Sequence, residues 1–434
     1  MRDNDRFMTA CEAAAALGVS PATLYSYVSR GMLHSEPVAG KPRLRCYLKE
    51  DVLRLVDRKE FRCNPAKAAA KGLHWGSPVL PSALTLIESD RFFYRGMDAL
   101  ELAETATLEE VAALLWTGDP KRARELFSGE CAPLPPRPAN LFKQLPLLGP
   151  VERCQLVLAF AAARDLSAYD LRPVAVPRIG VKILRLVFSA VVGSFVSSPL
   201  DTALVRAWIP TRKSSAPLLR AALILCADHE LNVSAFTARC IASARATPYE
   251  VVMGALAAFR GRRHGGVSEE VEILFRQAVR ARDCRPIVAK RLRLFGHVPG
   301  FGHRLYPKGD PRAQKLICLA QTYGRPSEVE LAKRLVQAAH DLTGEHPNLD
   351  FGLVTAARAL QLYSEAPIAI FALGRTVGWI AHAIEQYADH QLIRPRARYV
   401  GPVPPVRRAG PAPTHSVAVE SRRLGIDGGS VTPR

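Results

Sequence analysis

The feature that most constrains this chain is a long succession of apolar helical segments with little β signal, from about residue 73 to residue 401. Apolar residues recur there at the three- and four-residue spacing of a helix with one buried face. The clearest predicted helices are 107–116, 151–164, 216–227, 249–259, 326–342 and 369–387. The chain is therefore predicted to be mainly α.

Two short helices are predicted near the start of the chain. Thr9 and Glu12 have the spacing of a capping box, in front of an Ala-rich stretch that ends at Gly18. Ser20-Pro21 then opens a second helix, with Ser as the N-cap and Pro in the first turn. Two short helices joined by so tight a turn are typical of a helix-turn-helix.

A basic strand follows these helices. Residues 41–47 alternate basic and apolar side chains, as a short β-wing does, and 49–56 is predicted to be one more helix. A basic hairpin that is simply solvated is the alternative interpretation. The predicted organisation is a winged helix-turn-helix domain at 1–62, a linker at 63–76, a helical domain at 77–401, and a Pro-rich, disordered tail at 402–434.

Composition limits the compartment and the partners. No basic segment followed by an apolar stretch opens the chain, and the longest apolar run, 186–196, is shorter than the roughly 18 residues of a membrane span. The nine cysteines include no C-x-x-C pair and no histidine at zinc spacing, so we expect reduced thiols in the cytoplasm and no metal site. The net charge of +19 favours an anionic partner: nucleic acid, a polyphosphate-bearing cofactor or polycarboxylates.

Polar groups gather at the breaks between apolar helices, where a largely buried helical core would otherwise place nothing costly. The four stretches are Ala227-Asp228-His229-Glu230-Leu231-Asn232, Gly261-Arg262-Arg263-His264-Gly265-Gly266, Gly300-Phe301-Gly302-His303-Arg304-Leu305-Tyr306 with Gly309-Asp310-Pro311-Arg312 after it, and Pro347-Asn348-Leu349-Asp350-Phe351. Taken singly, these residues have ordinary alternatives. His264 beside glycines is more often structural, Asp350 after Pro-Asn is more often an N-cap, and Arg375 in a helix is more often an ion-pair partner. A structural or surface role is also expected for His297, His340, His346, His382 and His390.

Taken together and in order, these stretches resemble the citrate synthase family over nearly all of 73–401. Further motifs at the expected places are Ile87-Glu88-Ser89-Asp90 to Phe93-Tyr94-Arg95-Gly96, Gly374-Arg375-Thr376-Val377-Gly378-Trp379-Ile380-Ala381-His382, and Arg394-Pro395-Arg396-Ala397-Arg398-Tyr399-Val400-Gly401. The first segment separately resembles the winged helix-turn-helix of MerR-type regulators and excisionases. The resemblance to citrate synthases implies an all-α fold of a large and a small domain that close over the substrate.

The citrate synthase resemblance also implies a reaction, the condensation of acetyl-CoA with oxaloacetate to citrate and CoA. By resemblance, Asp350 removes a proton from the thioester methyl group, and His264 donates a hydrogen bond to the thioester oxygen as a neutral imidazole. His303 polarises the oxaloacetate carbonyl and protonates the new alkoxide. The resemblance implies that the carboxylates are held by His229, Arg312, Arg375 and Arg394.

The family also implies partners. Its last arginine comes from the neighbouring subunit, so a homodimer is expected, and no metal or tightly bound cofactor is needed, with acetyl-CoA as co-substrate. This chain has Arg262-Arg263 where the family usually has Pro-Leu, and a hypothesis is that one of these arginines reaches the CoA phosphates. After Asp350-Phe351 the family commonly has Ser-Gly, where this chain has Gly352-Leu353.

Alternative functions stay open at this point. Propionyl-CoA in place of acetyl-CoA makes the enzyme a 2-methylcitrate synthase. A regulator whose synthase domain senses a metabolite is the alternative from another class, with Tyr25, Lys41, Arg43 and Arg45 as candidate DNA contacts. A third possibility is that the first domain is an interaction module that alters assembly or allostery.

Overall fold

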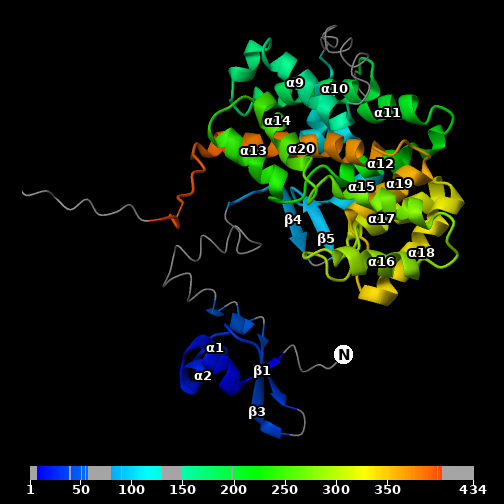
Figure 1. The fold of residues 1–434 in the computed structure, drawn as a ribbon. Helices are drawn as coiled ribbons and strands as arrows, with labels where there is room; N and C mark the ends of the chain where they lie inside the picture. The colour runs from blue at the N-terminus through cyan, green and yellow to red at the C-terminus, as the bar shows by residue number, and fades with distance from the viewer. Residues whose placement is uncertain are drawn as a thin grey trace, which may run out of the picture. The chain divides into compact units, whose positions relative to one another are not determined.

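The computed structural model describes residues 7–38, 41–49, 51–53, 55–56, 80–88, 90–129, 148–196, 199–397 and 399–402. The contacts divide the chain into two units, Met1–Ile393 and Arg394–Arg434. Figure 1 shows the fold. The predicted linker at 63–76 and nearly all of the predicted tail lie outside the described residues.

The first described elements are short and have a core of their own. Helix α1 (Ala10–Leu17) begins at Thr9, whose hydroxyl and backbone bond to Glu12 in the predicted capping box, and it ends at Gly18 with a left-handed φ of 58°. Helix α2 (Pro21–Ser29) has Ser20 as its N-cap. Strands β1 (Phe7–Thr9), β2 (Ser35–Val38) and β3 (Lys41–Leu48) form an antiparallel sheet in the order β1-β3-β2. The buried core residues of this part are Ala13, Ala14, Leu17, Leu24, Leu33, Tyr47 and Val52. The two predicted helices are confirmed.

A second small sheet interrupts the predicted succession of helices. It consists of β4 (Thr85–Glu88), β5 (Arg91–Tyr94) and β6 (Met97–Asp98) in that order, all antiparallel. The strands are too short for an alternating pattern to be recognised, and the helical pattern does not predict them. Arg95 and Gly96, with φ of 46° and 84°, form the turn between β5 and β6. The hydroxyl of Tyr94 donates to the backbone oxygen of Ile224 and so ties the sheet to the end of helix α12 (Ala216–Leu225).

Helices make up most of the rest. They are α5 (Ala99–Thr105), α6 (Leu108–Thr117), α7 (Ala123–Phe127), α9 (Pro150–Ala162), α10 (Val176–Val192), α11 (Leu200–Trp208), α12 (Ala216–Leu225), α13 (Val233–Ser243), α14 (Pro248–Phe259), α15 (Val267–Ala278), α16 (Arg285–Phe295), α17 (Pro311–Tyr323), α18 (Pro326–Thr343), α19 (Leu349–Ala359) and α20 (Ala366–Asp389). Three short 3₁₀ helices are η2 (Pro120–Arg122), η3 (Leu166–Tyr169) and η4 (Lys213–Ser215). All six helices predicted individually are present, with ends that differ by up to three residues.

Helix α20 is the centre of the larger core. It packs against α10, α12, α13 and α14, among which it runs in Figure 1. Gly374 and Gly378 are one turn apart on α20, and a Cβ on either would overlap the backbone oxygen of Leu223 or of Ala227. Glycine at these positions therefore lets α20 approach the end of α12 closely. α20 has the length and apolarity of a membrane span, yet within the described residues all of that span is buried inside the protein.

A second, smaller core lies among α15, α16, α18 and α19. Its buried members include Val271, Phe275, Val288, Leu335 and Phe351. The rings of Phe275 and Phe351 lie 5.1 Å apart between their centroids and join α15 to α19. The connection from α19 to α20 therefore runs from a helix with residues in both cores to the central helix of the larger one.

Candidate active site

Asp228 and His229 follow the end of α12, and both are buried. Nε2 of His382 lies 3.1 Å from Oδ1 of Asp228, and the Thr85 hydroxyl donates to Oδ2 of Asp228 at 2.6 Å. These bonds hold the loop that carries His229. Nε2 of His229 is 2.9 Å from the Tyr306 hydroxyl. Burial lowers the pKa of His229 well below its ordinary value, so this imidazole is neutral at physiological pH.

The loop that carries His303 is tied to the start of α19. Gly300 and Gly302 have φ of 84° and 76°, which glycine adopts without strain. The amide of Gly302 donates to the His346 oxygen at 2.9 Å, and the amide of Asn348 donates to the Gly300 oxygen at 2.9 Å. Because Asn348 is the N-cap of α19, this pairing places His303 beside the first turn of that helix.

His303 faces the other polar loop. Its ring centroid is 5.5 Å from that of His229, with the two rings perpendicular. The amide of Leu305 donates to Nδ1 of His303 at 3.2 Å, so the proton of the neutral ring is on Nε2. Burial, and then the charge of Arg312, lower the pKa of His303 to about 4. His303 is therefore a neutral hydrogen-bond donor.

Asp310 connects α17 to α19. It is fully buried and is the N-cap of α17. Its carboxylate accepts from Nε and Nη2 of Arg312 at 2.9 and 2.7 Å, and also from the amide of Leu349 at 3.1 Å. The same carboxylate thus fixes the guanidinium of Arg312 and the residue immediately before Asp350. Asp310 belongs to the Gly309-Asp310-Pro311-Arg312 stretch, but its supporting role was not predicted from the sequence.

Asp350 lies in the first turn of α19. The N-cap of this helix is Asn348, whose side chain accepts from the amide of Asp350 at 3.1 Å, so the alternative role of Asp350 as an N-cap is wrong. Oδ1 of Asp350 is buried and has no hydrogen-bond partner among the described residues. Burial raises the pKa of Asp350 to about 7, although Arg312 and Ser268 act in the opposite direction. A carboxylate in this state is a much stronger base than an exposed one.

His264 sits in the tight turn between α14 and α15. A Cβ on Gly265 would overlap the ring of Phe259, which explains the glycine there. Nε2 of His264 is 2.8 Å from the Ser234 hydroxyl, and Nε1 of Trp379 donates to the same oxygen at 3.0 Å. Burial, and then the charge of Arg375, lower the pKa of His264 to about 3. His264 is therefore a neutral imidazole held by an oriented hydroxyl.

Arg375 projects from the part of α20 that approaches α12. It is 1% exposed, and its Nε donates to the Cys226 oxygen at 2.6 Å. Within the part of the chain that the structure describes, its two terminal nitrogens have no protein partner. Burial lowers the pKa of Arg375 below its ordinary value, because the water lost by the charged form outweighs the attraction to the Asp228 carboxylate, with which it makes no hydrogen bond. An incoming anion supplies the missing partner.

The charges of Arg312 and Arg375 link six of the predicted residues, which are these two arginines, His229, His264, His303 and Asp350. Arg375 acts electrostatically on His229, His264 and Asp350. Arg312 acts on His229, His303 and Asp350. The residues predicted from five separate stretches therefore share one electrostatic neighbourhood that contains a base, three neutral imidazoles and two arginines.

Other predicted residues are not among these six. The Arg262 side chain is 89% exposed and pairs with Glu270 at 3.1 Å, and Arg263 is exposed. Arg394 begins the second unit, which is described separately. Tyr25 and Arg45 are exposed on α2 and β3, while the side chains of Lys41 and Arg43 are outside the described residues. Among the described residues no group of three or more His, Cys, Asp or Glu is placed to hold a metal ion.

Sequence reasoning missed the residues that support this site. Ser234 and Trp379 orient His264, Tyr306 contacts His229, and Asp310 fixes Arg312. Trp379, Tyr306 and Asp310 lie within the sequence motifs that resemble the citrate synthase family, and this location could have indicated a role at the site. Ser234 stands outside them, and only the fold shows that it reaches His264, 30 residues further along the chain.

The fold and the site define a mainly α enzyme that pairs a buried base with neutral imidazoles and with arginines suited to an anionic substrate. The family model "Citrate synthase, C-terminal domain" matches residues 72–396. The chain therefore belongs to the citrate synthase family, with the mainly helical fold of that family.

Individual relatives agree with this assignment. Citrate synthase 2 of Bacillus subtilis is 29% identical over 360 residues, which are 77% of this chain and 96% of the relative. The citrate/2-methylcitrate synthase of the same organism is 29% identical over 343 residues, 73% of this chain and 91% of the relative. The structure is similar, with a TM-score of 0.63 and 25% identity, to citrate synthase from Thermoplasma acidophilum in complex with carboxymethyl coenzyme A and oxaloacetate; the likeness covers 77% of this chain and 96% of that one.

Proposed function

We propose that this enzyme condenses acetyl-CoA with oxaloacetate to give citrate and CoA, with Asp350 as the base. The observation that carries the proposal is the buried, unpartnered Oδ1 of Asp350, in a carboxylate whose pKa is raised to about 7. Removing a proton from a thioester methyl group demands a strong base and simultaneous stabilisation of the enolate oxygen. Asp350 takes the proton, and the enolate carbon attacks the ketone carbon of oxaloacetate. Water then hydrolyses the citryl thioester.

The imidazoles act as neutral donors in this proposal. For His264 to donate to the enolate oxygen, its ring proton must be on Nδ1 and Nε2 must accept from the Ser234 hydroxyl. That hydroxyl also lies 2.8 Å from Oδ1 of Asn232, its other acceptor, so the proposal requires its proton to point to Nε2. Trp379 donates to the Ser234 oxygen and so supports this arrangement. Nε2–H of His303 polarises the ketone and protonates the alkoxide that forms on it.

The arginines and His229 hold the two carboxylates of oxaloacetate. Arg375 offers two unpartnered terminal nitrogens, and Arg312 keeps Nη1 after bonding to Asp310 through Nε and Nη2. The charges of both arginines act on His229. A guanidinium fork matches the geometry of a carboxylate. We propose Arg394 of the partner subunit as a further contact, which makes the active unit a homodimer, and Arg262 or Arg263 as contacts for the CoA phosphates.

A CoA-release assay tests this proposal and its closest alternative. The purified enzyme is given oxaloacetate with acetyl-CoA, and in parallel with propionyl-CoA. Faster turnover of acetyl-CoA supports the citrate synthase activity, and faster turnover of propionyl-CoA makes the enzyme a 2-methylcitrate synthase with the same residues. No CoA release with either thioester contradicts the proposal. No tightly bound cofactor is needed for either reaction.

We propose that residues 1–62 form a winged helix-turn-helix that contacts DNA. A linker at 63–76 joins it to a synthase domain at 77–401. We propose that the protein is cytoplasmic and has no membrane partner. The separate core of α1, α2 and the first sheet supports this arrangement, as does the exposure of Tyr25 and Arg45. A gel-shift assay tests this by mixing the full chain with duplex DNA at increasing salt concentration. A shift in the mobility of the DNA that is reduced by salt and by Arg45→Gln supports DNA contact, and the absence of a mobility shift at low salt contradicts it. Loss of DNA binding on adding oxaloacetate would favour the metabolite-sensing regulator.

A further inference from the structure

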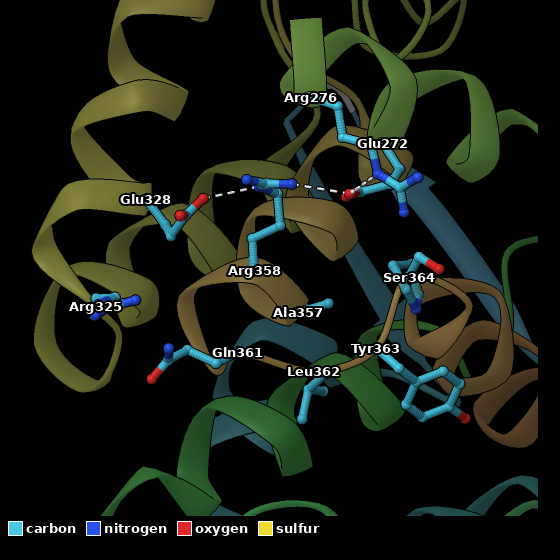
Figure 2. A pocket seen from close by; sticks show the side chains of 11 residues that line it. Glu272, Arg276, Arg325, Glu328, Ala357, Arg358, Gln361, Leu362, Tyr363 and Ser364 are labelled. Carbon is cyan, nitrogen blue, oxygen red and sulfur yellow. Dashed lines mark hydrogen bonds and ion pairs between the residues drawn. The ribbon is translucent and has the colours of Figure 1, made fainter. Parts of the chain in front are cut away.

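A cavity of about 340 Å³ lies where α19 connects to α20, and none of the proposed catalytic residues line it. Its walls come from α15, the start of α18, the end of α19 and the connection from residue 361 to 364 (Figure 2). This volume falls within the range of small-molecule sites and far exceeds the ~30 Å³ of one water molecule.

Arginines outnumber carboxylates on these walls. Arg358 donates through Nη1 to Glu272 and through Nε to Glu328, both at 2.8 Å, and Arg276 donates to the same oxygen of Glu272 at 2.9 Å. The backbone of Arg325 bonds to that of Ala359, but its guanidinium makes no hydrogen bond or ion pair within the described residues. Three guanidinium groups therefore face two carboxylates, and one positive charge is left uncompensated.

The geometry favours a phosphate over a carboxylate. In Figure 2, Arg276 and Arg325 lie on either side of Arg358, and therefore on different walls. A tetrahedral phosphate presents oxygens in several directions, while a planar carboxylate matches a single guanidinium fork. The exposed side chains of Gln361 and Ser364 have no hydrogen-bond partners among the described residues, and they offer further polar contacts. Leu362 and Ala357 provide apolar surface for a carbon skeleton.

We propose that this cavity binds a small organic phosphate, held by Arg276 and Arg325, and that its occupancy regulates closing of the enzyme. The cavity joins helices of the smaller core, α15 and α18, to the first residues of the central helix α20. Gln361 in the connection has a left-handed φ of 59°, which is a strained position for a residue other than glycine. A ligand that spans these walls restricts rotation of one core against the other. The regulatory part rests on the proposed function, while binding does not.

Isothermal titration calorimetry with ribose 5-phosphate as the probe tests binding without turnover. We expect saturable binding to the wild type and to the control variant Arg178→Gln, which removes the same charge from an exposed arginine that does not line the cavity. We expect Arg325→Gln to weaken binding at least tenfold. Absence of binding, or unchanged binding to Arg325→Gln, would overturn the proposal.

Kinetics test the regulatory part separately. Ribose 5-phosphate should change the KM for the acyl-CoA in the wild type and in Arg178→Gln, and leave it unchanged in Arg325→Gln. If the probe binds but changes no kinetic constant, closing is not regulated from this cavity. If the enzyme releases no CoA at all, the proposed function fails, while the calorimetric result still decides whether the cavity takes an organic phosphate.

Discussion

Replacing Arg375 with methionine should strongly reduce kcat/KM for oxaloacetate without lowering the free energy of unfolding. The two terminal nitrogens of Arg375 have no protein partner among the described residues, so the substrate is their expected partner. Two hydrogen bonds to a charged group contribute about 3 kcal/mol at the low end of the usual range. At about 1.4 kcal/mol per tenfold, kcat/KM for oxaloacetate should fall roughly 100-fold or more.

The same substitution removes a buried charge that is hydrogen-bonded to no carboxylate, although Asp228 attracts it. Taking a charge out of water costs several kcal/mol even after relaxation, and an apolar side chain of similar size avoids that cost. The weaker attraction left at Asp228 offsets part of this gain. The lost bond from Nε to the Cys226 oxygen costs about 1 kcal/mol. The free energy of unfolding without oxaloacetate should therefore stay within about 1 kcal/mol of the wild-type value or rise above it.

Arg239 supplies the matched control. It is also buried, at 2% exposure, but its Nη1 bonds to Glu385 at 2.7 Å. Arg239→Met leaves Glu385 without its charge partner and should cost about 3 kcal/mol, at the low end for a broken buried pair because Ser82 and Ala83 still donate to Glu385. Urea unfolding and steady-state kinetics measure both variants. The reasoning fails if Arg375→Met loses as much stability as Arg239→Met, or keeps its kcat/KM for oxaloacetate.

Three further results are expected. Because the base must be ionised, kcat/KM for acetyl-CoA should rise with pH and level off above the Asp350 pKa of about 7, and a rate that falls over this range contradicts the role of Asp350. Asp310→Asn should move that midpoint to lower pH, since the Asp310 charge raises the pKa of Asp350, whereas a purely structural role leaves the midpoint in place. Ser234→Ala should lower kcat about tenfold, the equivalent of one hydrogen bond, and leave the KM for oxaloacetate unchanged; an unaltered kcat means that Ser234 does not orient His264.

The helical part of the fold could be predicted because its signals are local. Caps such as Thr107 and the periodic apolar residues of α18 and α20 define a helix without reference to its neighbours. The sheet at 85–98 could not be predicted, because its longest strands have four residues and their hydrogen bonds join segments rather than positions within one segment.

The chemical groups of the site were predictable, but their supports were not. His264, His303 and Asp350 stand beside glycines or helix starts in the sequence. The hydroxyl that orients His264 comes from Ser234, on another helix, and no local pattern connects them. The raised pKa of Asp350 likewise depends on burial by segments distant in sequence, which periodicity does not report.

The most direct test of the account is the rate of CoA release by Asp350→Asn, measured with saturating oxaloacetate and acetyl-CoA. Asparagine keeps the shape of the side chain and removes only the base, so the rate should fall on the order of 10²–10⁴-fold, as for other general bases. Calorimetry should find oxaloacetate binding unchanged, because the arginines remain. A variant that turns over within a few-fold of the wild type would contradict proton removal by Asp350, and with it the proposed reaction mechanism.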